Sequence, residues 1–198
     1  MTLDRLRPLA DRGLSPFVAL ARWLGLTPDA VSAIAFVLAA AAALTFYAGG
    51  RWYLVGAFLV FANGWLDLLD GRLARDLGTE SPRGDVLDHV LDRYADLLLI
   101  AGLAAGVGRF GLGFAAVTGV LLTSYLGTQA EAVGLDRVYG GLLGRADRLA
   151  LIGVAAVLEP FVGPVGSLPP VGWLLVAFAV VGHLTAIQRF VATRRALG

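Results

Sequence analysis

The chain has 198 residues, 58% of them hydrophobic, with a mean hydropathy of +0.75 and a net charge of +1. A soluble domain uses about 45–50% apolar residues, so the composition predicts an all-α integral membrane protein. The absence of cysteine excludes disulfides, thiolate metal sites and thiol nucleophiles. All 16 basic residues are arginines that lie between apolar runs, which excludes a continuous basic stripe for nucleic acid.

Residues 1–26 carry four arginines among apolar positions. Phe17, Leu20, Ala21 and Leu24 follow i, i+3, i+4, i+7 spacing, which predicts an amphipathic helix in the plane of the membrane interface. A signal peptide is the alternative, but the arginines interrupt any apolar segment of signal length before Ala30.

Residues 30–50 are free of charge and long enough to span a hydrocarbon core of about 30 Å. The next apolar runs, 52–66 and 97–108, are too short to span alone. We therefore expect the second helix to extend through Asp67 to about Arg75, and the third to begin near Gly84. Ionisable groups at membrane depth are costly, so these charged ends mark a functional cavity inside the bundle.

Three further spans are predicted at 110–130, 144–160 and 171–188. We predict a single domain, residues 1–198, in which an interfacial helix (1–26) precedes a bundle of six transmembrane helices (27–195). With the N-terminus inside, 14 of the 16 arginines lie in cytoplasmic segments, leaving Arg51 and Arg109 outside. The positive-inside rule then places both termini and the acidic site on the cytoplasmic side of the cell membrane.

The segment 67–92 carries the chemistry, in the pattern D-x2-D-G-x2-A-R-x8-G-x3-D-x3-D. On a helix, positions 67, 70, 71 and 74 share one face, as do 84, 88 and 92 on the next helix. Two antiparallel helices would aim Asp67, Asp70, Asp88 and Asp92 at one volume. Four carboxylates this close repel one another unless cations lie among them, and hard divalent ions prefer such oxygen ligands. The pattern therefore predicts a two-metal site.

The same pattern resembles the signature of the CDP-alcohol phosphotransferase family of membrane enzymes. The resemblance implies transfer of a phosphatidyl or archaetidyl group from a CDP-linked lipid to an alcohol, with release of CMP, in phospholipid biosynthesis. It implies two Mg²⁺ or Mn²⁺ ions, a lipid donor, a small polar acceptor and a homodimer. By resemblance Asp67, Asp70 and Asp88 are metal ligands, and Asp92 is the catalytic base that also touches one ion.

The family also implies contacts with the nucleotide of the donor. Pro28-Asp29-Ala30-Val31-Ser32 resembles its Pro-Asn-x-x-Thr element, with Asp29 and Ser32 in the polar positions; a helix N-cap is the alternative for Asp29. Gly71 and Ala74 leave the aspartate face bare so that a nucleotide can approach, or they serve close helix packing. The remaining predicted contacts are Arg75, Ser81 and Gly84, with a membrane anchor as the alternative for Arg75 and turn chemistry for Ser81.

The segments 124–132 and 144–149 resemble the branch that makes phosphatidylinositol phosphate or its archaeal ether-lipid counterpart, and 91–96 resembles the archaeal type. Acceptors in that branch carry a phosphate, which Arg137, Arg145 and Arg148 would bind; a row of membrane anchors is the alternative. Gly127 and Gln129 stand where basic residues are expected, so glycerol phosphate and an unphosphorylated alcohol remain open. Asp96 is expected to contact the acceptor or an arginine.

A function of another class, a divalent-metal transporter, would also place aspartates in the membrane. A transporter needs polar residues through the full depth of several spans. Here 14 of the 15 acidic residues lie in segments assigned to or near the cytoplasmic side, with Glu159 as the exception. This distribution favours the transferase.

Overall fold

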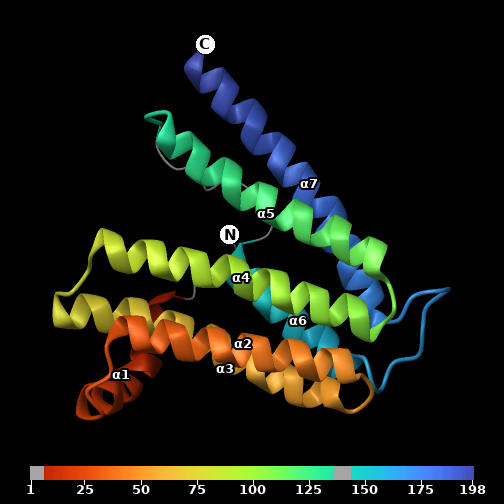
Figure 1. The fold of residues 1–198 in the computed structure, drawn as a ribbon, viewed down its shortest axis with the longest axis horizontal. Coiled ribbons are helices and arrows are strands. Elements are labelled where there is room, and N and C mark those ends of the chain that lie inside the picture. Colours follow the sequence, from red (N-terminus) through yellow and green to blue (C-terminus); the bar gives the residue numbers. More distant parts are fainter. Residues whose placement is uncertain (1–6, 136–143) are drawn as a thin grey trace.

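The computed structural model describes residues 7–135 and 144–198, and within these ranges the chain forms seven helices and no β-strand (Figure 1). They are α1 (Arg7–Trp23), α2 (Pro28–Ala48), α3 (Trp52–Leu77), α4 (Pro82–Gly106), α5 (Phe110–Ala132), α6 (Arg145–Leu158) and α7 (Pro170–Leu197). Prolines at the first position of α2, α4 and α7 favour helix initiation there. The all-α prediction is confirmed for the described residues.

Four of the described helices, α2, α3, α5 and α7, are long and apolar enough to cross a membrane. The predicted second span does continue through its charged end, since α3 runs unbroken from Trp52 to Leu77. α4 has 25 residues and carries Asp88, Asp92 and Asp96. α6 has only 14 residues, shorter than the span predicted at 144–160. Its helical turns end at Leu158, before Glu159 and Pro160.

At one end of the bundle, α2, α3 and α4 pack closely; we call this the closed end. Its core contains Phe46, Tyr53, Leu103 and other residues exposed by at most a few per cent. Gly102 of α4 lies against the backbone of Ala43 in α2, where an added Cβ would come within 2.8 Å of the Ala43 Cα. Glycine therefore sets the distance between the two backbones here.

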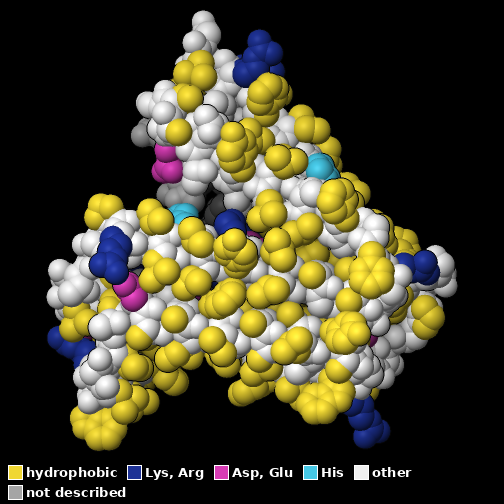
Figure 2. All heavy atoms as spheres, viewed as in Figure 1, with side chains coloured by type: hydrophobic (Ala, Val, Ile, Leu, Met, Phe, Trp, Pro, Cys, Tyr) yellow, Lys and Arg dark blue, Asp and Glu magenta, His cyan; other side chains and the backbone are white. Residues whose placement is uncertain are grey.

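At the opposite end, which we call the site end, the helices separate. α5 and α7 pack along each other and diverge from α4 toward Ala132 and Leu197 (Figure 1). The surface in Figure 2 is hollowed between this pair and the rest of the bundle, with arginine and histidine side chains beside the hollow. Apolar side chains cover most of the remaining face, as expected for a protein surrounded by lipid.

α1 packs across the site end of α3. Leu14, Val18 and Ala21 are buried in a small cluster with Leu69 and Leu73. Ala21 thus belongs to the face that packs against the protein, whereas the sequence grouped it with a membrane-facing stripe. Phe17, Leu20 and Leu24 of that stripe are 44%, 50% and 55% exposed. The helix therefore has two apolar faces, one against α3 and one open.

Candidate active site

The carboxylates converge from α3 and α4, as the spacing predicts. Asp67 and Asp70 of α3 and Asp88 of α4 each offer an oxygen atom, and these atoms lie within 4.8 Å of one another. Asp70 is buried, while Asp67 and Asp88 are half-buried. Oxygen ligands on opposite sides of a Mg²⁺ ion lie about 4.2 Å apart, twice the usual metal–oxygen distance. With small side-chain adjustments the three carboxylates can therefore bind one hard divalent cation.

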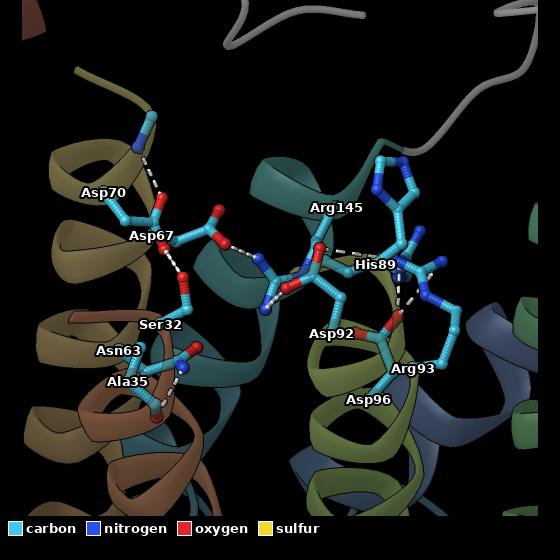
Figure 3. A network of polar contacts seen from close by, with 12 residues as sticks. Ser32, Ala35, Asn63, Asp67, Asp70, His89, Asp92, Arg93, Asp96 and Arg145 are labelled. Atoms are coloured by element: carbon cyan, nitrogen blue, oxygen red, sulfur yellow. Dashed lines mark hydrogen bonds and ion pairs between the residues drawn. The ribbon is translucent and has the colours of Figure 1, made fainter. Parts of the chain in front are cut away.

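Two short hydrogen bonds orient the Asp70 carboxylate (Figure 3). The Ser32 hydroxyl of α2 donates to Asp70 Oδ2 at 2.6 Å, and the Gly71 backbone N–H donates to Oδ1 at 2.6 Å. Ser32 itself is only 7% exposed. This places Ser32 in contact with a predicted metal ligand, so its side chain acts on the site through Asp70.

Arg145, the first residue of α6, lies between the carboxylates of the two other helices (Figure 3). Its guanidinium forms a hydrogen-bonded ion pair with Asp67 Oδ1, and its Nη2 lies 2.7 Å from Asp92 Oδ1. Asp92 thus lies in the same pocket as the other three aspartates, and Arg145 offsets part of their mutual repulsion. The pocket is lined by Ser32, Ala35, Phe36, Asn63, Asp67, Asp70, Asp88, Leu91, Asp92, Ala95 and Arg145.

A second set of ion pairs lies one turn farther along α4. Asp96 is 2% exposed and accepts a hydrogen bond from Arg148 Nη2 at 2.7 Å. Arg93 lies 3.7 Å from Asp96 and 3.6 Å from Asp92, and it also donates to the Ser124 hydroxyl of α5. Asp96 was expected to contact either the acceptor or an arginine, and in the structure it contacts Arg148. These pairs join α4 to α5 and α6.

Three predicted nucleotide contacts, Asp29, Ser81 and Gly84, lie close together at the starts of α2 and α4. Thr27, rather than Asp29, caps α2, because the Thr27 hydroxyl accepts from the Ala30 N–H at 3.2 Å. The N-cap alternative for Asp29 is therefore wrong; its carboxylate instead lies near the start of α4, within 3.6 Å of where a Cβ on Gly84 would be. Ser81 caps α4 by accepting from the Gly84 N–H at 3.1 Å.

The other predicted contacts lie on the last turns of α3. Gly71 and Ala74 are half-buried, and Arg75 is exposed with its guanidinium near Gly71. Arg137 lies outside the described residues. The remaining predicted acceptor contacts, Arg145 and Arg148, come to the site but pair there with aspartates.

Two contributors to the site were not predicted. Arg93 follows Asp92 directly and reaches Ser124 on another helix, a contact that helical spacing cannot reveal. Asn63 is 1% exposed and lines the carboxylate pocket. A signal for Asn63 is present in the sequence, because it precedes Asp67 by four residues and so extends the same face of α3.

The comparisons with known proteins agree with this geometry. The family model described as CDP-alcohol phosphatidyltransferase matches residues 25–144. A phosphatidylinositol phosphate synthase from Cutibacterium acnes is 35% identical, over 96% of this chain and 93% of the relative. An archaetidylinositol phosphate synthase from Methanothermobacter thermautotrophicus is 30% identical, over 96% and 92% of the two chains.

The fold also matches solved structures. A phosphatidylinositol phosphate synthase from Mycobacterium tuberculosis with CDP-DAG bound superimposes with a TM-score of 0.80 at 28% identity, covering 92% of this chain and 94% of the other. The same enzyme in complex with manganese and citrate gives a TM-score of 0.80 at 27% identity, covering 91% and 88%.

Proposed function

The chain belongs to the CDP-alcohol phosphatidyltransferase family, and on this basis we propose that it transfers a phosphatidyl or archaetidyl group from a CDP-linked lipid to inositol phosphate. It is a metal-dependent membrane enzyme of phospholipid biosynthesis. The observation that carries the proposal is the convergence of Asp67, Asp70 and Asp88 to within 4.8 Å from two helices. The chain is similar both to phosphatidylinositol phosphate synthases and to archaetidylinositol phosphate synthases, so the donor is either an ester lipid or an ether lipid.

The reaction forms one phosphorus–oxygen bond and breaks another. The acceptor hydroxyl attacks the phosphorus nearest the lipid, the bond to the CMP phosphate breaks, and CMP leaves with that bridging oxygen. Asp92 takes the hydroxyl proton as general base, since its carboxylate lies in the same pocket as the metal ligands. Bound divalent cations supply positive charge that offsets the charge of the diphosphate and of the departing CMP.

We assign the metal-binding role to Asp67, Asp70, Asp88 and Asp92, with two Mg²⁺ or Mn²⁺ ions per site. The bound manganese in the M. tuberculosis enzyme supports a divalent metal. Ser32 and the Gly71 N–H fix the orientation of Asp70, so that this carboxylate meets a cation without first reorganising. Oxygen-only ligands match the preference of Mg²⁺ and Mn²⁺.

For the donor, we assign the nucleotide contacts to the rim between α2, α3 and the start of α4. Gly71 and Ala74 present little side-chain bulk on the aspartate face, which leaves room for a diphosphate or a flat base. Arg75 is exposed there and is able to pair with a phosphate oxygen. Asp29, Ser81 and Gly84 lie close together, where the first turns of α2 and α4 meet.

For the acceptor, the arginines at the start of α6 and on α7 favour a phosphorylated alcohol. Arg145 and Arg148 lie at the start of α6. Arg189 of α7 is buried, and its Nη1 donates to the Thr123 carbonyl at 2.7 Å. Arg137, outside the described residues, is assigned the same role. Arginine binds phosphate well because its planar guanidinium donates two parallel hydrogen bonds.

We further propose that all of α2 to α7 cross the membrane, giving six spans within one domain. α4 is about 37 Å long at 1.5 Å per residue, enough to cross, and its charged face is paired within the bundle. The arginine distribution supports a position of both termini and the site at the cytoplasmic side of the cell membrane. A homodimer is expected from the family.

The test is CMP release by the purified protein in lipid nanodiscs. CDP-diacylglycerol is supplied with Mg²⁺ or Mn²⁺ and a panel of inositol phosphate, glycerol phosphate, inositol and glycerol. We expect inositol phosphate to give the largest kcat/KM and to appear in the lipid product. A preference for glycerol phosphate would reassign the acceptor, and no CMP release with any alcohol would overturn the transferase. Metal uptake without CMP release would favour the transporter instead.

A further inference from the structure

Asn63 lies on the inner face of α3, one turn before Asp67. It is 1% exposed, and its side chain lines the pocket that holds the four aspartates. Figure 3 shows the Asn63 amide beneath Asp67, with its oxygen directed toward the space between α3 and α4. Burying an amide costs free energy unless its polar atoms find partners. Both ends of the Asn63 amide therefore require a hydrogen-bond partner.

One end of the amide is fixed by a backbone contact. The Nδ2 atom donates to the Ala35 carbonyl of α2 at 2.8 Å. A carbonyl only accepts, so the atom facing Ala35 must be the amino group, and the oxygen must face the other way. Asn63 Oδ1 is buried and has no hydrogen-bond partner among the described residues. The contact with α2 thus holds an unsatisfied acceptor in the pocket.

The chemistry of Oδ1 limits what its partner is. An amide oxygen accepts hydrogen bonds, so the partner carries an O–H or N–H group. The ionised oxygens of a diphosphate only accept, which excludes them. Among the other side chains that line the pocket, those of Ser32 and Arg145 carry donors, and they pair with Asp70 and with Asp67 and Asp92 instead. The partner is therefore a molecule with an O–H or N–H group that enters the pocket.

The proposed reaction brings such a molecule to this place. Asp92, the proposed base, lines the same pocket from α4, and it must meet the hydroxyl that it deprotonates. We propose that Asn63 Oδ1 accepts a hydrogen bond from a hydroxyl of the acceptor alcohol, and so selects a polyol in the pocket beside Asp92. This inference rests on the proposed function and adds a specificity-determining residue to it.

This contact would let the enzyme discriminate between alcohols that have the matching hydroxyl and alcohols that lack it. An alcohol that lacks the matching hydroxyl leaves Oδ1 buried and unpaired, and an unpaired buried polar group costs about 1–3 kcal/mol, which corresponds to about 5- to 150-fold in affinity. A site built to bind a hydroxyl therefore rejects an analogue without it more strongly than an apolar site does.

The experiment compares wild-type protein with Asn63→Leu, which has similar volume and no polar atom. Tyr53→Phe is the matched control. It removes the buried Tyr53 hydroxyl, which also lacks a hydrogen-bond partner among the described residues and lies on the same helix at the closed end. Inhibition constants of single-deoxy inositol phosphates are measured against each protein, together with KM for inositol phosphate. Mn²⁺ affinity and CDP-diacylglycerol binding are measured separately.

We expect Asn63→Leu to raise KM for inositol phosphate by about tenfold, with Mn²⁺ and donor binding unchanged. In wild type, one deoxy analogue should bind about tenfold more weakly than the others, and this difference should vanish in Asn63→Leu. Tyr53→Phe should retain the difference. Asn63→Ala gives the same comparison if the leucine variant does not fold.

Two results in Asn63→Leu would overturn the inference alone. Retention of the deoxy preference in Asn63→Leu would show that another group reads the hydroxyl. A loss of Mn²⁺ affinity with an unchanged KM would make Asn63 a metal ligand instead. If wild type releases CMP with a different alcohol, the deoxy series of that alcohol is used, and the acceptor rather than the role of Asn63 has been misassigned. If wild type releases no CMP with any alcohol, both proposals fail.

Discussion

The closed end and the site end are built from the same helices, α2, α3 and α4, yet they are held together in different ways. At the closed end, Gly102 lies against Ala43, and the core is formed by side chains such as Phe46 and Leu103. At the site end, α1 packs on α3 through apolar side chains, whereas hydrogen bonds and ion pairs line the pocket, such as that of Arg145 of α6 with Asp92 of α4 at 2.7 Å.

The difference has a physical reason. Small apolar residues let two helices touch, and such packing leaves no space for a ligand. Carboxylates on facing helices repel one another, and opposite charges must lie between them. One end therefore supplies stability and the other supplies a pocket. Substitutions at the two ends should separate folding from activity.

The largest effect is expected from loss of the metal ligands. Asp88→Asn, or an excess of chelator on wild type, should reduce CMP release at least about 10³-fold, because metal charge stabilisation is worth several kcal/mol. The variant should keep its thermal unfolding temperature, since removing one of several clustered anions does not weaken the closed end. Chelator-resistant turnover would contradict a metal-dependent reaction. Calorimetry of Mn²⁺ binding checks the ligand role independently.

Asp92→Asn tests the base at the same end. The amide keeps the shape of the side chain but takes no proton, so kcat should fall by about 10²–10⁴-fold. Binding of CDP-diacylglycerol should be retained, because Asp67, Asp70 and Asp88 remain as ligands for the cations. A single-turnover assay measures the chemical step directly. A rate within a few-fold of wild type would assign the base to another group.

Asp96→Asn tests whether ion pairs hold the site end. Arg148 would remain buried without its carboxylate, and breaking one partner of a buried pair costs about 3–5 kcal/mol. Thermal unfolding followed by tryptophan fluorescence should therefore shift strongly downward. Asp76→Asn is the control, because Asp76 pairs with the partly exposed Arg22 and Arg72, and exposed pairs contribute about 0–1 kcal/mol. Equal shifts in the two variants would deny Asp96 a special role.

Gly102→Ala tests the closed end with the smallest change. The added Cβ would lie 2.8 Å from the Ala43 Cα, so α2 and α4 must move apart, at a cost of about 1–3 kcal/mol. Gly111→Ala in α5 is the control, because its Cβ would meet nothing within 4 Å. Turnover per folded molecule should remain near wild type in both. A fall in kcat for Gly102→Ala at unchanged stability would mean that the two ends are coupled.

The sequence predicted the features that follow from helical periodicity. The spacing of Asp67, Asp70 and Asp88 placed them on facing sides of two helices, and the structure brings them together. Likewise, the short apolar run after Trp52 required a helix that continues through its charged end, as α3 does.

What could not be predicted depends on contacts between distant segments. Arg145 lies 78 positions from Asp67, and only the packing of α6 against α3 brings them into contact. The orphaned oxygen of Asn63 follows from a bond to Ala35 on another helix. Thr27 was not predicted as the N-cap of α2, because the polar residues Thr27 and Asp29 lie on either side of Pro28 and the local sequence does not decide between them.

The 14 residues of α6 measure about 21 Å, whereas the hydrocarbon core of a bilayer is about 30 Å thick. Leu151 and Val154 on this helix are 38% and 51% exposed, so acyl chains can lie against it. Lipid adapts to a short wall by thinning. If α6 crosses the membrane as we propose, the leaflets beside it are drawn together, and the polar headgroups there lie closer to the level of Arg145 than elsewhere around the protein.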